Sequence, residues 1–180
     1  MQKRKYDTEP PTALRKYKEE DMQELLQRVN SDEKLKKLLK ISSHTITLLS
    51  ILVFAVTVLF AAHTSIIRAA KILISAAIPF IIVSVSRYII NAKRPYEVYT
   101  FYETPPKNKK GRSFPSRHVF SSFIIATLLI TVGPIYAVIF YIVATLLAVC
   151  RVLLGIHFVR DVIAGAVMGI ISGVIALLLI

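Results

Sequence analysis

The chain has little of the side-chain chemistry on which disulfide-bonded and metal-holding proteins depend. Its single cysteine, Cys150, excludes a disulfide within the chain and a metal site built from several cysteines. Charged residues make up only 19% of the 180 residues, against 54% in the hydrophobic class, and the mean hydropathy is +0.59. These proportions exclude a disordered chain and are too apolar for an ordinary soluble domain.

Acidic residues are also scarce, and their distribution along the chain is uneven. Residues 1–43 carry 11 lysines and arginines and 8 acids, whereas residues 44–180 carry 12 bases and only three acids. Most of the formal net charge of +12 therefore lies in the apolar part of the chain. A basic surface can indicate nucleic-acid binding, but here the bases separate long apolar runs. We therefore expect a membrane protein with basic loops and no nucleic-acid partner.

The first 43 residues form a polar tail with a weak helical pattern. Apolar residues recur at spacings of three and four between residues 15 and 40, which predicts an amphipathic helix with a break near residues 30–32. Such a helix could lie on the membrane surface or dock on a partner helix. A solvated charged tail is the alternative. The segment is too long and too acidic for a cleaved signal peptide.

Five apolar stretches follow the tail. A helix needs roughly 20 residues to cross the hydrocarbon core of a bilayer. The candidate spans are residues 44–67, 72–90, 119–132, 135–154 and 157–180, of which the third reaches full length only if its helix begins within 115–118. We predict an all-α, polytopic membrane bundle of about five transmembrane helices, with residues 1–43 as a tail and 44–180 as the membrane domain.

A group of cations at the rim of the predicted spans needs a partner. Charged groups in or near a span are costly and are usually paired. If the spans alternate in direction, one face holds Arg87, Arg94, Arg151, His118 and His157, with Asp161 as the one carboxylate at comparable depth. One acid cannot neutralise three guanidinium groups, so an anionic ligand is expected. Phosphate fits best, because its oxygens accept the bidentate fork of arginine.

The spacing of the histidines and the acid indicates a catalytic role. His157 and Asp161 are four residues apart and would share one face of a helix. An aspartate bonded to one ring nitrogen leaves the other free as a nucleophile or base. Arg151 reaches the same place if Gly155 permits a turn. His118 follows a Pro-Ser-Arg segment at the start of a predicted helix, where backbone N–H groups favour anions.

Three motifs in this order resemble the type 2 phosphatidic acid phosphatase superfamily of membrane lipid phosphatases. The matching segments read Arg87-x6-Arg94-Pro95, Pro115-Ser116-Arg117-His118 and Cys150-Arg151-x5-His157-x3-Asp161. The family has Lys where Arg87 stands, Gly where Arg117 stands and Ser where Cys150 stands. All three motifs lie within residues 87–161, which is the part of the chain that the resemblance covers.

The resemblance implies a mechanism and a set of site residues. His157 would attack phosphorus to give a phosphohistidine, Asp161 would orient it, and His118 would protonate the leaving group and then activate water. The phosphate oxygens would be held by Arg87, Arg94, Arg151, Ser116 and the segment around Arg117. The family needs no metal or other cofactor, which agrees with the absence of a carboxylate cluster here. For Arg117, we expect a contact with a lipid headgroup or a second phosphate.

Two further expectations concern the membrane face and the last helix. The face with the motifs also carries Lys93, Lys107, Lys109, Lys110 and Arg112, whereas the opposite face has only Arg68 and Lys71. The positive-inside rule therefore predicts that the N-terminus and the active site face the cytoplasm. As the location, we expect the plasma membrane. Many family members have six spans and the opposite orientation. Gly165, Gly169 and Gly173 predict close helix packing, within the bundle or in a homo-oligomer.

The sequence thus favours a phosphatase acting on a lipid phosphate within a membrane. Phosphatidate, phosphatidylglycerophosphate and polyprenyl phosphates or diphosphates are the candidate substrates. A lipid-linked phosphotransferase is one alternative, since a phosphohistidine can pass its phosphoryl group to an alcohol. A lipid-phosphate binder or transporter without catalysis is the other, although arginines alone would suffice for binding.

Overall fold

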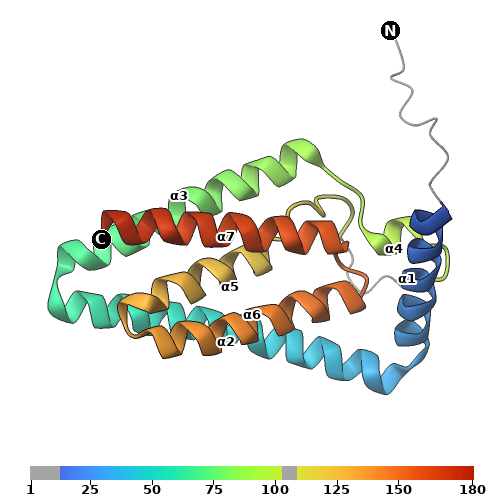
Figure 1. Cartoon of the computed structure of the whole chain (residues 1–180), viewed down its shortest axis with the longest axis horizontal. Helices are drawn as coiled ribbons and strands as arrows, with labels where there is room; N and C mark the ends of the chain where they lie inside the picture. The colour runs from blue at the N-terminus through green and yellow to red at the C-terminus, as the bar shows by residue number, and fades with distance from the viewer. Residues whose placement is uncertain (1–12, 103–108) are drawn as a thin grey trace, which may run out of the picture.

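The computed structural model describes residues 13–102 and 109–180, with side chains from residue 20 onward. Within these residues the chain is helical and has no strand: α1 (Ala13–Ser31), α2 (Glu33–Thr64), α3 (Ile66–Ile90), α4 (Pro95–Val98), α5 (Arg117–Leu128), the 3₁₀ helix η1 (Leu129–Thr131), α6 (Pro134–Leu153) and α7 (Val159–Leu179). The long helices lie side by side along one axis, and α1 runs across one end of the bundle (Figure 1). The predicted all-α membrane bundle is confirmed.

Four helical segments are long and apolar enough to cross a membrane. They are α2, α6, α7 and the segment Ile66–Val98, which includes α3. Their outer surfaces carry exposed leucines, isoleucines and valines, which fits contact with lipid rather than water. The protein is therefore an integral membrane protein. The fifth predicted span is α5 with η1, and at 12 and 3 residues it is shorter than the others.

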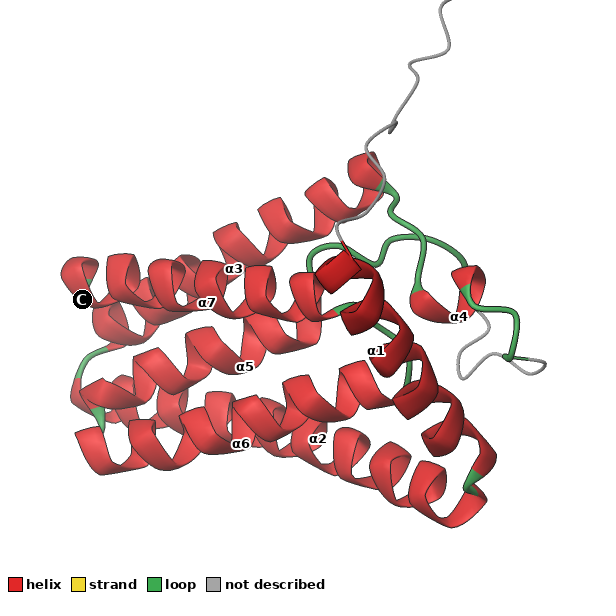
Figure 2. Ribbon diagram, turned by 45° about the vertical axis from the view of Figure 1, so that its right-hand side comes forward, coloured by secondary structure: helices red, strands yellow, loops and turns green. Residues whose placement is uncertain are grey.

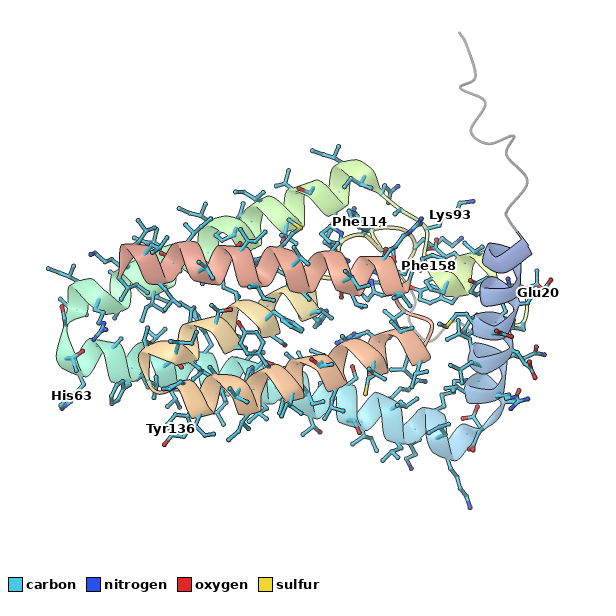
Figure 3. All side chains as sticks on the ribbon, viewed as in Figure 1. Glu20, His63, Lys93, Phe114, Tyr136 and Phe158 are labelled. Atoms are coloured by element: carbon cyan, nitrogen blue, oxygen red, sulfur yellow. The ribbon has the colours of Figure 1, made fainter. Side chains whose placement is uncertain are left out.

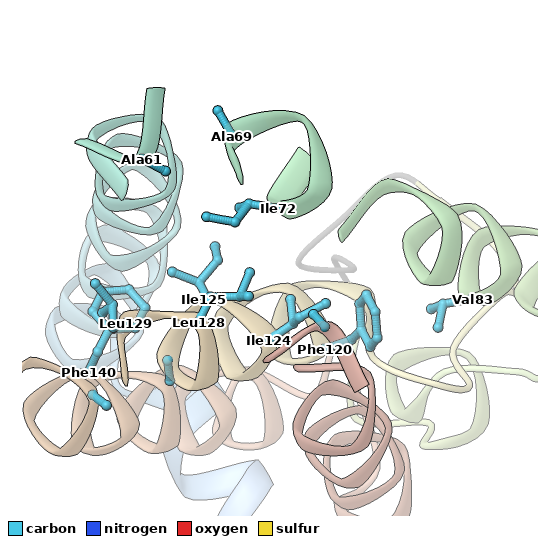
Figure 4. Packing of buried hydrophobic residues seen from close by; sticks show 13 residues of the cluster. Ala61, Ala69, Ile72, Val83, Phe120, Ile124, Ile125, Leu128, Leu129 and Phe140 are labelled. Carbon is cyan, nitrogen blue, oxygen red and sulfur yellow. The ribbon is translucent and has the colours of Figure 1, made fainter. Parts of the chain in front are cut away.

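Helix α5 is the centre of the bundle, and this explains its length and composition. Phe120, Ile124 and Leu128 are at most 3% exposed and pack against residues of α2, α3 and α6 (Figures 2 and 4). The segment 111–116 precedes α5 and lies at the end of the bundle that also carries α4 (Figure 1). Helix α5 therefore begins only at Arg117. A helix enclosed by protein on its sides can thus be shorter than the hydrocarbon core.

The glycines of α7 allow it to pack closely on α5. A Cβ atom at Gly165 would lie 2.6 Å from the carbonyl oxygen of Ser116, and one at Gly169 would lie 2.6 Å from that of Phe120. Gly173 faces the side chain of Thr127 in the same way. The glycine face of the last helix is therefore used within the chain. A homo-oligomer through α7 would have to use other residues of that helix.

From Ala13 onward, the polar tail folds into α1 and the first part of α2, and its first 12 residues lie outside the described part of the chain. The predicted break near residues 30–32 falls at Asp32, whose carboxylate accepts the N–H groups of Lys34 and Leu35 at 3.0 Å and begins α2. The buried side chains of α1, Leu26 and Val29, are 2% and 5% exposed. Helix α1 thus docks on its own bundle, and α2 continues without interruption past residue 43.

The two ends of the bundle differ in structure. One end carries α1, α4 and the α6–α7 turn, and the other carries the α2–α3 and η1–α6 turns and the C-terminus (Figure 1). Lys93, Phe114 and Phe158 lie at the first end, and His63 and Tyr136 lie at the second (Figure 3). This is the pairing of segments that the alternating spans predict. Lys107, one of the loop bases in that prediction, lies outside the described residues.

Candidate active site

The turn between α6 and α7 brings His157 back toward Arg151. Gly155 has φ +65°, a left-handed conformation that glycine adopts without a steric penalty. The N–H groups of Ile156 and His157 both donate to the carbonyl oxygen of Arg151, at 3.1 and 3.3 Å. His157 is only 2% exposed. The expectation that Gly155 permits this turn is confirmed.

Asp161 is fixed by the start of α7 rather than by a shared helical face with His157. Helix α7 begins at Val159, so His157 precedes the helix and the two residues are not one helical turn apart within it. The carboxylate oxygen Oδ2 of Asp161 accepts the N–H of Phe158 at 3.0 Å and so caps the helix. The aspartate is fully buried, at 0% exposed. Its position is therefore set by the cap before any contact with His157 is considered.

Ser113 joins the histidine to the aspartate. Its hydroxyl donates to Oδ2 of Asp161, and its Oγ lies 3.4 Å from Nδ1 of His157. The direct distance from Nδ1 to Oδ2 is 3.7 Å, which is too long for a hydrogen bond. A proton on Nδ1 can point toward Ser113 and Asp161, which leaves Nε2 with its lone pair free. This is the tautomer that a nucleophilic histidine needs.

We expect His157 to be neutral at pH 7. Burial lowers the pKa of His157 from 6.5 to about 4; the contact with Asp161 opposes this shift, and the charges of Arg94 and Arg87 reinforce it. Imidazole ¹⁵N resonances of histidine-labelled protein, assigned by their absence from His157→Ala, should therefore keep the values of a neutral ring from pH 8 to pH 5. They should titrate only near pH 4. A midpoint at the ordinary value of 6.5 would contradict this placement.

Arg87 and Arg94 hold the loop that leads to α5. Arg94, 6% exposed, donates from Nε to the carbonyl oxygen of Gly111 at 2.9 Å and from a terminal nitrogen to that of Ile156 at 3.3 Å. Arg87 donates to the carbonyl oxygens of Arg112, Ser113 and Pro115. A guanidinium group has five N–H donors, so these bonds leave donors for an anion.

Arg151 adds a third guanidinium group, within range of the charge of Arg94. It is 4% exposed, and one terminal nitrogen donates to Oγ1 of Thr47 on α2 at 3.3 Å. Its Nε has no hydrogen-bond partner among the described residues. The charge of Arg94 repels both Arg87 and Arg151. An anion between these groups would replace that repulsion with charge-assisted hydrogen bonds.

The segment with Ser116 and His118 is bonded to the first turn of α7. The N–H of Ser116 donates to the backbone oxygen of Asp161 at 2.9 Å, in addition to the bond from Ser113 to its carboxylate. The hydroxyl of Ser116 is buried and has no hydrogen-bond partner in the part of the chain that the structure describes. His118 lies in the first turn of α5 and is half-buried. Two hydrogen bonds to Asp161 thus hold the segment 113–116 next to the start of α7, close to His157.

Arg117 lies on the α3 side of the site, where its charge repels that of Arg87. Its side chain is exposed, and its guanidinium carbon is 5.3 Å from the centre of the Phe80 ring on α3. All eight predicted site residues therefore lie at this end of the bundle, and the side chain of Arg117 differs from the others in that it is exposed and lies against α3. No group of three His, Cys, Asp or Glu side chains suited to a metal ion occurs within 13–102 and 109–180.

Three residues of the site were not among the sequence candidates. Ser113 could have been suspected only from its hydroxyl group and its position three residues before Ser116 in the same loop. Glu97 accepts the N–H groups of Arg94 and Gly111 at 2.9 and 2.8 Å, and the Pro95-x-Glu97 spacing is that of a capped helix start. Thr47 had no signal, because it lies 104 residues before Arg151 in sequence.

Comparisons with known proteins identify the family and the fold. The family model of the PAP2 superfamily matches residues 68–180. The fold resembles LpxE from Aquifex aeolicus, with 23% identity and a TM-score of 0.67 over 87% of this chain and 93% of that chain. It also resembles a PAP2 type phosphatidylglycerolphosphate phosphatase from Bacillus subtilis, with 20% identity and a TM-score of 0.69 over 93% and 87%. No curated protein matches. The chain thus belongs to the PAP2 superfamily, the type 2 phosphatidic acid phosphatases that its three motifs resemble.

Proposed function

We propose that the protein is a metal-independent membrane phosphatase that hydrolyses the terminal phosphate of a lipid phosphate through a phosphohistidine at His157. The observation that carries this proposal is the burial of His157 beside Arg87 and Arg94, with Arg151 buried next to Arg94. These arginines supply the positive charge that phosphoryl transfer requires, so no metal ion is needed for that purpose.

In the first step, Nε2 of His157 attacks phosphorus in line with the bond to the lipid oxygen. A P–N bond forms as the P–O bond breaks, and the electron pair of that bond leaves with the lipid oxygen. His118 donates a proton to this oxygen, so the lipid departs as an alcohol or, from a diphosphate, as a monophosphate. Ser113 and Asp161 stabilise the positive charge that develops on the His157 ring.

In the second step, water attacks the phosphohistidine. His118, which lost its proton in the first step, accepts a proton from the water. The new P–O bond forms as the P–N bond breaks, and inorganic phosphate and neutral His157 are released. During both steps the arginines and the hydroxyl of Ser116 bind the equatorial oxygens, where negative charge is spread in the transition state.

A groove on the lipid side supports a lipid substrate. It has a volume of about 290 Å³ and is lined by Ile51 and Phe54 of α2, Ala77 and Phe80 of α3, and Ile124 of α5, among others. Its lining is almost wholly apolar, as expected for a site that accepts an acyl or prenyl chain. The resemblance to the Bacillus subtilis phosphatidylglycerolphosphate phosphatase makes phosphatidylglycerophosphate one candidate, beside phosphatidate and the polyprenyl phosphates.

For sidedness, we propose that the site faces the cytoplasm at the plasma membrane, because the basic residues gather at the site end. Cysteines introduced at Lys110, on the site end, and at Arg68, on the other end, form a matched pair, since both positions are exposed and the native Cys150 is buried. In intact cells, an impermeant thiol reagent should label the cysteine at 68 and spare the one at 110. Labelling of position 110 alone would contradict the proposed orientation.

Phosphate release from a panel of lipids tests the proposed function. The purified protein should release inorganic phosphate from at least one of phosphatidate, phosphatidylglycerophosphate and a polyprenyl phosphate, with EDTA present. His157→Ala is the control for contaminating phosphatase. Release from no lipid would favour a binder or transporter, and transfer of the phosphoryl group to an added alcohol without release would indicate a phosphotransferase. Loss of activity with EDTA would contradict the metal-independent mechanism.

A further inference from the structure

Arg117 is the site-end arginine whose surroundings the reaction above does not explain. It is the first residue of α5 and stands where the family motif has glycine. Its guanidinium carbon lies over the ring of Phe80, a cation–π contact that does not require the N–H groups as hydrogen-bond donors. Neither a hydrogen bond nor an ion pair holds this side chain within the described part of the protein. The Arg117 charge also repels Arg87.

The depth of Arg117 makes an unpaired cation costly. Phe80 lies ten residues before Ile90, the last residue of α3, which corresponds to about 15 Å along the helix. The hydrocarbon core is about 30 Å thick, so the ring of Phe80 lies well inside the membrane zone. A charged side chain at such a depth usually marks the path of an ion or substrate and is paired there. An anionic group of a membrane lipid would supply that pairing.

Arg117 stands where the phosphate site meets the apolar groove. On one side, its neighbours in sequence are Ser116 and His118, which belong to the phosphate site. On the other side, Phe80, which lies under the guanidinium group, also lines the groove. Ser121, one helical turn after Arg117 and on the same face of α5, lines the groove as well. A lipid with its phosphate at His157 and its chain in the groove would pass Arg117 between the two.

We propose that Arg117 binds a second, non-scissile phosphate of the substrate, so that the enzyme prefers lipids with two phosphate groups. This inference rests on the proposed phosphatase function and adds a substrate class to it. Two chemical sources offer such a phosphate: a diphosphate ester, in which the two phosphates are directly joined, and a lipid in which a terminal phosphate is separated by glycerol from a phosphodiester. Both place an anion between the scissile phosphate and the chain.

The test compares matched pairs of lipids on the same protein. One pair is a prenyl diphosphate and the prenyl monophosphate of equal chain length, and the other is phosphatidylglycerophosphate and phosphatidate with the same acyl chains. The readout is the ratio of kcat/KM within each pair, because a ratio measured on one preparation is insensitive to loss of folded protein. Wild-type protein should prefer the lipid with two phosphates in at least one pair. That pair shows whether the second phosphate comes from a diphosphate ester or from a phosphodiester.

Arg117→Gln should lower this ratio about tenfold, and Arg117→Lys, which keeps the charge but loses the fork, should lower it less. Arg112→Gln is the matched control, since Arg112 is also exposed and lies over an α3 ring, that of Tyr88, which does not line the groove. Its ratio should equal that of wild type. An equal fall in Arg112→Gln would indicate a general effect of charge and would overturn the assignment to Arg117.

The failure of this inference differs from the failure of the proposed function. If wild-type protein hydrolyses lipid phosphates and Arg117→Gln keeps the wild-type ratio in both pairs, the second-phosphate site is wrong and the phosphatase stands. A wild-type protein that prefers the monophosphate in both pairs also overturns the inference. If wild-type protein releases phosphate from none of the four lipids, the phosphatase function fails, and the inference fails with it.

Discussion

His157→Ala should lower kcat for phosphate release by about 10⁴-fold or more, because it removes the proposed nucleophile. Loss of the ring takes away the atom that would form the P–N bond, and no other histidine of the described residues is buried in this way beside Arg87 and Arg94. The measurement is phosphate release in detergent micelles with the preferred lipid of the panel, at protein concentrations high enough to detect the residual rate.

His63→Ala provides the matched control for this result. His63 lies at the other end of the bundle and is exposed, so the same substitution there should leave kcat at the wild-type value (Figure 3). Both variants should elute as wild type in size-exclusion chromatography. A His157→Ala enzyme that keeps more than a tenth of the wild-type kcat would remove this histidine from the role of nucleophile.

Asp161→Asn should lower kcat by about 10³- to 10⁴-fold, as loss of the orienting acid does in other histidine-dependent enzymes. Asparagine keeps the shape of the side chain but not its negative charge. Its amide oxygen can take the place of Oδ2 and accept the bonds from Phe158 and Ser113, so the substitution mainly removes the charge. The charge that develops on His157 during attack would lose its counterion. Single-turnover phosphate release measures the effect on the chemical step.

Ser113→Ala serves as the graded comparison for Asp161→Asn. It removes one hydrogen bond to the carboxylate and the contact with Nδ1 of His157 while Asp161 keeps its charge. We expect kcat to fall about tenfold, because a hydrogen bond to a charged group contributes about 1.5 kcal/mol or more. If Asp161→Asn were no slower than Ser113→Ala, the carboxylate charge would have no catalytic role and the orientation argument would fail.

The membrane helices follow closely from hydropathy, because the bilayer demands apolar helices of a given length. The lower bound of α2 differs from the predicted span, since its first eleven residues, from Glu33 to Ser43, are helical before the apolar run begins. The docking of α1 on its own bundle could not be derived from its pattern. An apolar stripe such as that of Leu26 and Val29 indicates that this face of the helix is buried, but it does not identify the surface that covers it.

In the site, too, the residues of the sequence motifs could be predicted, but the contacts between residues far apart in the sequence could not. The motif residues are grouped in sequence, and their chemistry indicates phosphate. The bond between Arg151 and Thr47 joins residues 104 positions apart, which no local pattern reports. The spacing of four between His157 and Asp161 suggests a helical face, but Gly155 and the cap at Phe158 place His157 before the helix. Ser113 then fills the gap between them, which only the fold reveals.

Chemical quench of the reaction with a ³²P-labelled lipid phosphate tests the central claim most directly. Phosphohistidine is labile in acid and stable in alkali, so label trapped on the protein can be distinguished from phosphoserine and from free phosphate. We predict transient label on His157, no label in His157→Ala, and slower decay of the label in His118→Ala, where attack by water is slowed. Rapid turnover of the wild-type enzyme with no label on His157 at any time would contradict this claim.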